Sequence, residues 1–186
     1  MEIEIRAKIS NTKNIQNLLS QIGAKLVKEV SQIDRYYGAI CLYKKLGYTF
    51  LLRVRYQGKK AFLTYKGAKQ KKAGVWEEYE FPITEPSQME NMLSEMGLDL
   101  VIEVHKHRLE YTLNNFTICI DEIKGLGTFV EVELQTSDKT STTQAKAKIQ
   151  DLLTKLNINK ESIIHEGYVT LLLKKNKTAY SNYIVN

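Results

Sequence analysis

The feature that most constrains the fold is the regular placement of charge. Charged residues recur at every second position in several short stretches, Glu2/Glu4/Arg6/Lys8, Arg53/Arg55, Glu78/Glu80, Lys106/Arg108 and Glu131/Glu133. The residues between them are mostly apolar, as at Leu52, Val54 and Val132. Because alternate residues of a β-strand share a face, this pattern predicts a sheet with one charged face and one apolar face.

The remaining segments predict helices that could cover the apolar face. Strands are expected over 2–9, 25–37, 48–57, 60–66, 75–83, 99–113, 116–122 and 127–135. Helices are expected from a cap at Asn11 or Thr12 to Gly23, from Pro86 to Gly97, and over 139–156 and 161–175. Their apolar residues recur at helical spacing, so these stripes should pack on the apolar side of the sheet. The expected fold class is α+β.

An internal repeat suggests how the chain is built. Residues 14–30 match 88–104 at eight of seventeen positions when the two segments are aligned at an offset of 74. The matches include Gly23 with Gly97, and both flanks of these glycines. Chance similarity between amphipathic helices explains the matched leucines more easily than the glycine and its flanks, so two similar halves are expected.

With about eight strands and short connections, the sheet is expected to close. Closure removes exposed strand edges, and it gives an eight-stranded antiparallel β-barrel with the helices outside. Its charged face would line a lumen, where unpaired ions are costly unless water, a metal or a polyanion fills the space. The alternative is an open sheet whose charged face is simply solvated. The grouping of like charges favours the lumen, since a bound divalent ion would relieve their repulsion.

The two kinds of charge indicate complementary ligands. Carboxylates without a Cys or His cluster are typical of Mg²⁺ or Mn²⁺ sites rather than Zn²⁺ sites. Guanidinium and ammonium groups suit phosphoryl oxygens, and a net charge of +6 also favours anionic partners. The cations predicted to hold a triphosphate are Arg53, Arg55, Lys66, Lys106 and Arg108.

The motifs, in their order, resemble those of a known family. The opening Glu2-Ile-Glu4-Ile-Arg6 resembles the E-x-E-x-K signature of the CYTH superfamily, the triphosphate tunnel metalloenzymes. Further similar segments are Asp34-Arg-Tyr36-Tyr37, Leu52-Arg53-Val-Arg55, Leu63-Thr-Tyr65-Lys66-Gly67, Glu78-Tyr-Glu80, Lys106-His-Arg108, the run from Asp121 to Glu133, and Tyr168 with Leu171-Leu172. The resemblance extends from Glu2 to about Leu172. It implies a tunnel fold with an enzymatic site inside.

The resemblance also implies roles for individual residues. The implied metal ligands are Glu2, Glu4, Glu131 and Glu133, with Asp121 or Glu80. The phosphate-binding set gains Arg6, which stands where the signature has lysine, and Lys8 on the same face. Catalytic candidates are Glu4, Lys66 and Tyr37. Of the tyrosine pair Tyr36 and Tyr37, one is expected to enter the lumen, with a structural role as the equal alternative.

Three functions are compatible with this site. The first is a metal-dependent triphosphatase that hydrolyses tripolyphosphate or a nucleoside or organic triphosphate, with Mg²⁺ or Mn²⁺. The second is a class IV adenylate cyclase that makes cyclic AMP and pyrophosphate from ATP. It needs a pocket for the base, which the sequence does not reveal, so hydrolysis is favoured. The third is a non-catalytic binder of polyphosphate or RNA, against which the paired carboxylates argue.

Several broader expectations follow from composition. No apolar stretch approaches the length of a membrane span, and the charged N-terminus does not resemble a signal peptide, so a cytoplasmic protein is expected. Cys41 and Cys119 have apolar neighbours and should be reduced core residues. One tunnel domain over 1–175 with a polar tail over 176–186 is expected. Nucleic acid is the less favoured partner, and the sequence leaves a homodimer open.

Overall fold

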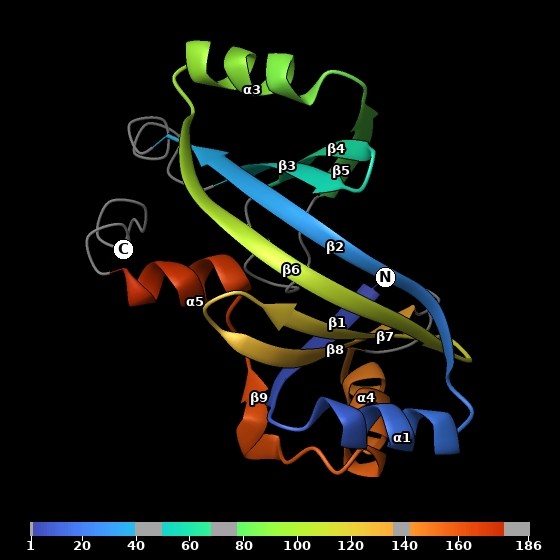
Figure 1. Cartoon of the computed structure of the whole chain (residues 1–186). Helices are drawn as coiled ribbons and strands as arrows, with labels where there is room; N and C mark the ends of the chain where they lie inside the picture. Colours follow the sequence, from blue (N-terminus) through green and yellow to red (C-terminus); the bar gives the residue numbers. More distant parts are fainter. Residues whose placement is uncertain (1, 40–49, 68–77, 136–141, 177–186) are drawn as a thin grey trace. The chain divides into compact units, whose positions relative to one another are not determined.

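A computed structural model gives the fold over residues 2–39, 50–67, 78–135 and 142–176. The chain divides into two compact units (Figure 1). Unit 1 comprises Met1–Val30 and His107–Glu166, and unit 2 comprises Ser31–Lys106 and Gly167–Asn186. Two long strands, β2 (Lys25–Gly38) and β6 (Asp99–Leu113), each run through both units.

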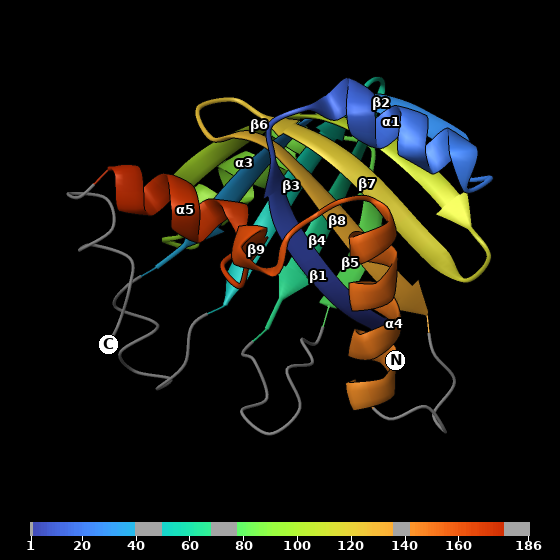
Figure 2. The same ribbon diagram turned by 90° about the horizontal axis from the view of Figure 1, so that it is seen from below.

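Unit 1 combines three full strands with two helices. Its elements are β1 (Glu2–Ile9), α1 (Thr12–Gln21), β7 (Phe116–Ile123), β8 (Gly127–Gln135), α4 (Thr142–Lys155), the short 3-10 turn Lys160–Ser162 and β9 (Ile163–Ile164). β8 pairs antiparallel with β1 on one side and β7 on the other. Helices α1 and α4 cover one face of these strands (Figure 2), where Leu19 and Ile149 pack with Val130 and Val132 in a hydrophobic core.

Unit 2 has a smaller core on a second set of antiparallel strands. Its elements are β3 (Leu51–Gln57), β4 (Lys60–Lys66), β5 (Glu78–Ile83), α3 (Pro86–Glu95) and α5 (Tyr168–Lys175). The strands pair in the order β2, β3, β4, β5. Leu93 of α3 packs with Tyr37 and Val54 from the strands, so α3 covers the apolar face that alternation predicts.

The described strands form one nine-stranded order, β5-β4-β3-β2-β6-β7-β8-β1-β9. The α+β class and the large antiparallel sheet are therefore confirmed. Closure of this sheet into a barrel is not confirmed, because the strand order has β5 and β9 at its ends. The second edge of β1 is taken by β9, which pairs at Arg6 with Ile164 and at Ala7 with Ile163. The helix expected over 161–175 begins only at Tyr168, because this strand precedes it.

The sequence repeat has a counterpart in local structure. Helix α1 spans Thr12–Gln21 and α3 spans Pro86–Glu95, so both bounds differ by the offset of 74. Each helix ends before a glycine with positive φ, +81° at Gly23 and +79° at Gly97, a conformation that glycine adopts without strain. The amide of each glycine donates to a serine carbonyl three residues earlier, at 3.0 and 2.9 Å.

Candidate functional site

The charged face of unit 1 follows directly from the strand register. Residues directly opposite each other on paired strands share a face, and the rows across β1, β8 and β7 are Glu4-Glu133-Thr117, Arg6-Glu131-Cys119 and Lys8-Phe129-Asp121. The intervening positions, such as Ile5, Val132 and Ile118, belong to the hydrophobic core. Alternation in the sequence therefore predicted correctly which side chains share this face.

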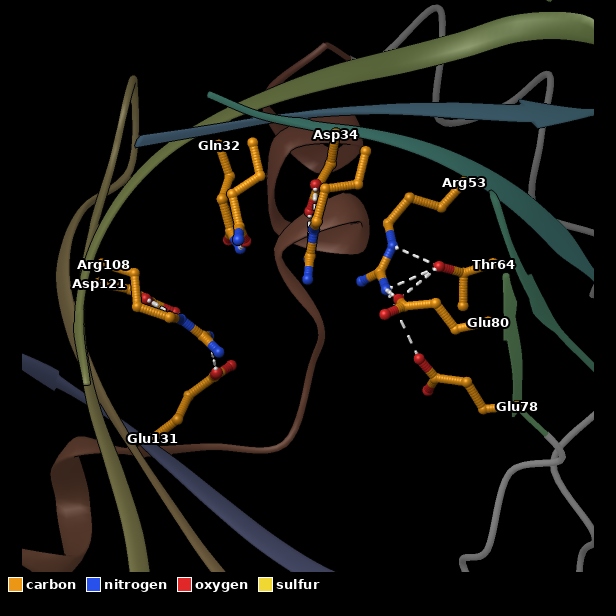
Figure 3. Close-up of polar contacts among 11 residues, drawn as sticks. Gln32, Asp34, Arg53, Thr64, Glu78, Glu80, Arg108, Asp121 and Glu131 are labelled. Carbon is orange, nitrogen blue, oxygen red and sulfur yellow. Dashed lines mark hydrogen bonds and ion pairs between the residues drawn. The ribbon is translucent and has the colours of Figure 1, made fainter. Parts of the chain in front are cut away.

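Two arginines hold the carboxylates of this face. Arg108 binds Asp121 through two parallel hydrogen bonds of 2.6 Å and also bonds to Glu131 (Figure 3). Arg6 donates from Nε to Glu131 Oε1 at 2.6 Å and from Nη2 to Glu4 Oε1 at 2.6 Å. We call Glu4, Arg6, Arg108, Asp121 and Glu131 the unit 1 cluster.

Burial shapes the chemistry of this cluster. The side chains of Asp121 and Glu131 are 0% and 5% exposed, so their charges depend on the guanidinium groups. Burial would lower the pKa of Arg108, but hydrogen bonds and the charges of Asp121 and Glu131 raise it above its usual range. Burial also raises the pKa of the nearby Cys119 thiol to about 12. Cys119 is free and buried, as predicted, whereas Cys41 lies outside the described residues.

The donors of this face have the chemistry that a hard divalent cation prefers, and in this structure arginines bond to them. Carboxylate oxygens are the ligands that Mg²⁺ and Mn²⁺ prefer. Within the described residues, however, no three His, Cys, Asp or Glu side chains stand where they could hold a metal ion together. Instead, the carboxylates of Glu4, Asp121 and Glu131 bond to arginines. The Glu2 side chain lies outside the described part of the chain.

Unit 2 carries a second charged face. The row across β2 to β5 is Tyr36-Arg53-Thr64-Glu80, and the next row begins Asp34-Arg55. Arg53 donates to the Thr64 hydroxyl at 2.9 Å and to Glu80 Oε2 at 2.8 Å, and the hydroxyl donates to the same Glu80 oxygen at 2.8 Å (Figure 3). We call Asp34, Arg53, Arg55, Thr64 and Glu80 the unit 2 cluster.

Two cations of unit 2, Arg53 and Lys106, are more buried than its acids Glu78 and Glu80. Arg53 and Lys106 are each 6% exposed, while the side chains of Glu78 and Glu80, both ion-paired to Arg53, are 40% and 41% exposed. Asp34 is the buried acid, and Arg55 binds it through two hydrogen bonds of 2.6 and 2.7 Å. Among the described side chains that are buried on this face, cations therefore outnumber acids.

Asp34 illustrates how this positive environment acts. Burial would raise the pKa of its carboxyl, but the hydrogen bonds from Arg55 and the charges of Arg55, Lys106 and Arg53 lower the pKa below its usual value. Asp34 is therefore held as a carboxylate that offsets part of the surrounding positive charge.

The structure distinguishes the two neighbouring tyrosines. Tyr36 lies on the charged face, where burial and the charge of Asp34 raise its pKa. Tyr37, the catalytic candidate from the sequence, lies in the hydrophobic core of unit 2. Burial and the neighbouring Glu90 on α3 raise the pKa of Tyr37 to about 12. Since adjacent strand residues face opposite sides, the tyrosine on the charged face is Tyr36, and the predicted Tyr37 lies on the other face of the strand.

The structure describes two further predicted lysines, Lys8 and Lys66, to different extents. Lys8 is exposed, with its Nζ 6.0 Å from the Phe129 ring centroid. The backbone of Lys66 pairs in register with Glu78, and its side chain lies outside the described part of the chain.

The sequence analysis missed Thr64 as a site residue. Thr64 stands two residues before Lys66, so strand alternation places both on one face. Asp34 belonged to a recognised motif but not to the predicted site.

Comparison with known proteins places the chain in a family. Residues 1–168 match the CYTH domain. A Methanocaldococcus jannaschii protein named a "putative adenylate cyclase" is 30% identical over 173 residues, 92% of this chain and 98% of the relative. The solved PH1012 protein of Pyrococcus horikoshii is 27% identical with a TM-score of 0.77, covering 91% of this chain and 98% of that one.

A third likeness concerns the fold. A Hippeastrum protein described as a "putative adenylyl cyclase" with a dominant triphosphatase activity has a TM-score of 0.65 at 19% identity, covering 95% of this chain and 96% of that one. The helices in the described residues include none that is long and apolar enough to cross a membrane. The match over 168 residues, together with the charged strands that carry the signature motifs, shows that the chain belongs to the CYTH family.

Proposed function

We propose that the chain is a divalent-metal-dependent triphosphatase, which hydrolyses inorganic tripolyphosphate or an organic triphosphate. The supporting observation is the excess of buried positive charge in unit 2, where Arg53, Arg55 and Lys106 act on Asp34, the one buried carboxylate among the described residues of this unit. A polyanion would satisfy such a face. In the ion pairs of Arg53 with Glu78 and Glu80, the carboxylates are 40% and 41% exposed whereas Arg53 is 7% exposed. Phosphate oxygens can therefore replace these solvated carboxylates as partners of the buried guanidinium.

The two arginines of the unit 2 cluster differ in what they offer a phosphate. Arg55 is held by both oxygens of Asp34, so its guanidinium is oriented by a buried acid. Arg53 is held by the neutral Thr64 hydroxyl and by Glu80, so it can exchange one partner while the hydroxyl keeps it in place. Arg53 is therefore proposed to bind a phosphoryl group directly and Arg55 to supply a fixed charge.

The acidic residues of unit 1 are proposed to hold Mg²⁺ or Mn²⁺. Carboxylate oxygens are the ligands that such hard cations prefer, and a bound ion would offset the negative charge of these acids. Glu4 and Glu133 occupy directly opposite positions on β1 and β8, where two like charges repel. This repulsion supports a cation as a partner of the pair.

Adenylate cyclase is the second candidate, supported by the name of the M. jannaschii relative. The same cations would bind ATP, but the attacking group would be the ribose 3′-hydroxyl and pyrophosphate would leave. The Hippeastrum protein combines a cyclase name with a dominant triphosphatase activity. A cyclase name therefore does not by itself decide between these reactions.

Product analysis separates these functions. The purified protein is incubated with tripolyphosphate or ATP, each with Mg²⁺, Mn²⁺ or EDTA, and orthophosphate, pyrophosphate and cyclic AMP are measured. Metal-dependent orthophosphate release is expected. Cyclic AMP with pyrophosphate would establish the cyclase instead, and tight binding without any product would leave a non-catalytic binder of polyphosphate or RNA.

A matched pair of arginine variants tests the site. Arg53→Met should lower kcat/KM by about a hundredfold, because a charge-assisted contact to the phosphate is lost. Arg35→Met is the control, since Arg35 binds Glu90 and Glu103 rather than the unit 2 cluster. Circular dichroism of both variants checks folding. Equal losses in the two variants would contradict the assignment of Arg53.

A further inference from the structure

Arg6 makes an unusually complete set of bonds for a residue on a charged face. Its three nitrogens each donate: Nε to Glu131 Oε1 at 2.6 Å, Nη2 to Glu4 Oε1 at 2.6 Å, and Nη1 to the Glu166 backbone carbonyl at 2.9 Å. The Arg6 side chain is 14% exposed. The guanidinium thus cross-links two carboxylates that the sequence predicts as metal ligands.

A lysine could not reproduce this arrangement. The guanidinium is a planar fork with donors on three nitrogens, whereas a lysine has one nitrogen at the end of a flexible stem. The CYTH signature that the N-terminus resembles has lysine at this position. The substitution of arginine is therefore a feature of this chain that changes how the acidic residues are neutralised.

Of the two carboxylate partners of Arg6, Glu131 is the less able to accept a second cation. Glu131 is 5% exposed, and Arg108 already bonds to its other oxygen, Oε2, while Arg6 bonds to Oε1. Both oxygens of this buried carboxylate therefore face a guanidinium. A metal ion that binds Glu131 must compete with these hydrogen bonds, which are stronger than bonds between neutral groups.

We propose that Arg6 is an internal counter-cation that competes with the divalent ion for Glu4 and Glu131. Metal binding then requires Arg6 to leave at least one of these carboxylates. The affinity for metal is accordingly lower than that of the same site with lysine. This inference rests on the proposed function, because it takes the unit 1 acids as metal ligands.

The test measures Mn²⁺ affinity in the absence of any substrate. Mn²⁺ is titrated into the full chain, wild type and Arg6→Lys, with the free ion followed by its electron paramagnetic resonance signal and the heat by calorimetry. Arg6→Lys should bind Mn²⁺ about ten to a hundred times more tightly, the gain expected when charge-assisted hydrogen bonds no longer oppose binding. Arg35→Lys is the matched control and should leave the affinity unchanged.

The two lysine variants make the outcomes distinct. Both keep the net charge, so tighter binding by Arg6→Lys alone supports the competition. Binding of Mn²⁺ with the same affinity by all three proteins would overturn the inference and leave the proposed function standing. No binding by any of them would overturn both. Binding by Arg6→Lys but not by the wild type would support the inference and contradict the proposed metal dependence of the natural chain.

A second readout separates competition from a purely structural role. At a given concentration, a bound ion raises the Tm by an amount that grows with the logarithm of its affinity for the folded state. In EDTA the Arg6→Lys variant should have a lower Tm than the wild type, because Glu4 and Glu131 lose hydrogen bonds. Saturating Mn²⁺ should raise the Tm of this variant more than that of the wild type. An equal rise in both proteins would show that Arg6 only supports the fold.

Discussion

Among the described residues, the buried charged side chains of unit 1 are the carboxylates of Asp121 and Glu131, whereas those of unit 2 are the cations Arg53 and Lys106 with the single acid Asp34. The ions of both clusters are paired, but the buried charge in excess is negative in unit 1 and positive in unit 2. A buried ion is tolerated only with a partner, so each excess indicates what would complete the site. Unit 1 suits a further cation, and unit 2 suits a further anion.

The comparison predicts that removal of a buried acid lowers the free energy of unfolding most where buried cations outnumber buried acids. Asp34→Asn should lower the free energy of unfolding by about 3–5 kcal/mol, because the cations around it lose their buried counter-charge. Urea denaturation at neutral pH measures this change. Asp99→Asn, an exposed acid of the same unit, is the control and should change stability by less than about 0.5 kcal/mol.

Acid denaturation sharpens the same test. The pKa of Asp34 is lowered in the folded state, so the unfolded chain binds this proton more readily. The stabilisation is complete above the ordinary pKa of about 3.9 and is lost as the pH falls through the lower folded value. In Asp34→Asn this contribution to acid sensitivity below about pH 4 should vanish. An unchanged acid transition would show that another carboxyl controls it.

Cys119 reports on the anionic character and burial of unit 1. Its pKa is raised from 9.0 to about 12, so the reactive thiolate should be about a thousandfold scarcer at pH 8 than for an ordinary thiol. In a Cys41→Ser background, the rate of labelling by a thiol reagent should be correspondingly low. The same protein in urea is the control, and rapid labelling of the native protein would contradict the burial of this face.

Asp121→Asn should have a smaller effect than Asp34→Asn. Arg108 loses its two bonds to Asp121 but keeps Glu131, and the removal of one acid relieves repulsion within an acid-rich cluster. We expect a loss of about 1.5–3 kcal/mol in the free energy of unfolding, measured in EDTA. A loss larger than that of Asp34→Asn would reverse the proposed difference between the units.

Glu80→Gln should have the smallest effect on stability. The Glu80 side chain is 41% exposed although its partner Arg53 is buried, so water already screens this carboxylate and we expect a loss of up to about 1 kcal/mol. Arg53 also keeps its hydrogen bond to Thr64. Thermal unfolding should therefore differ little from the wild type, and a loss comparable with that of Asp121→Asn would show that Glu80 is an essential partner of Arg53.

Local patterns in the sequence predicted most of the fold. The strands β6, β7 and β8 lie within a residue of their expected ranges, because strict alternation fixes which residues are buried. Asn11 caps α1 by accepting a hydrogen bond from the Asn14 amide at 3.0 Å, one of two caps expected. These features depend on neighbours in the chain, which a sequence displays directly.

Contacts between distant segments could not be predicted in this way. The strand β9 has only two residues, too few for a period, and it exists because Ile163 and Ile164 pair with β1. Two of the three partners of Arg6 are 125 residues away at Glu131 and 160 residues away at Glu166. No spacing in the sequence signals that an arginine would take up oxygens predicted to bind metal.

By itself the sequence determined the charged and apolar faces, the family and the residue types of the site, because side-chain direction in a strand follows from the backbone period. Only the tertiary structure decided the partners: that Tyr36 rather than Tyr37 lies among charges, that Thr64 holds Arg53, and that arginines occupy the acids of unit 1. The physical reason is that the energy of a charge depends on its burial and its partners, and these are set by strands brought together from distant parts of the chain.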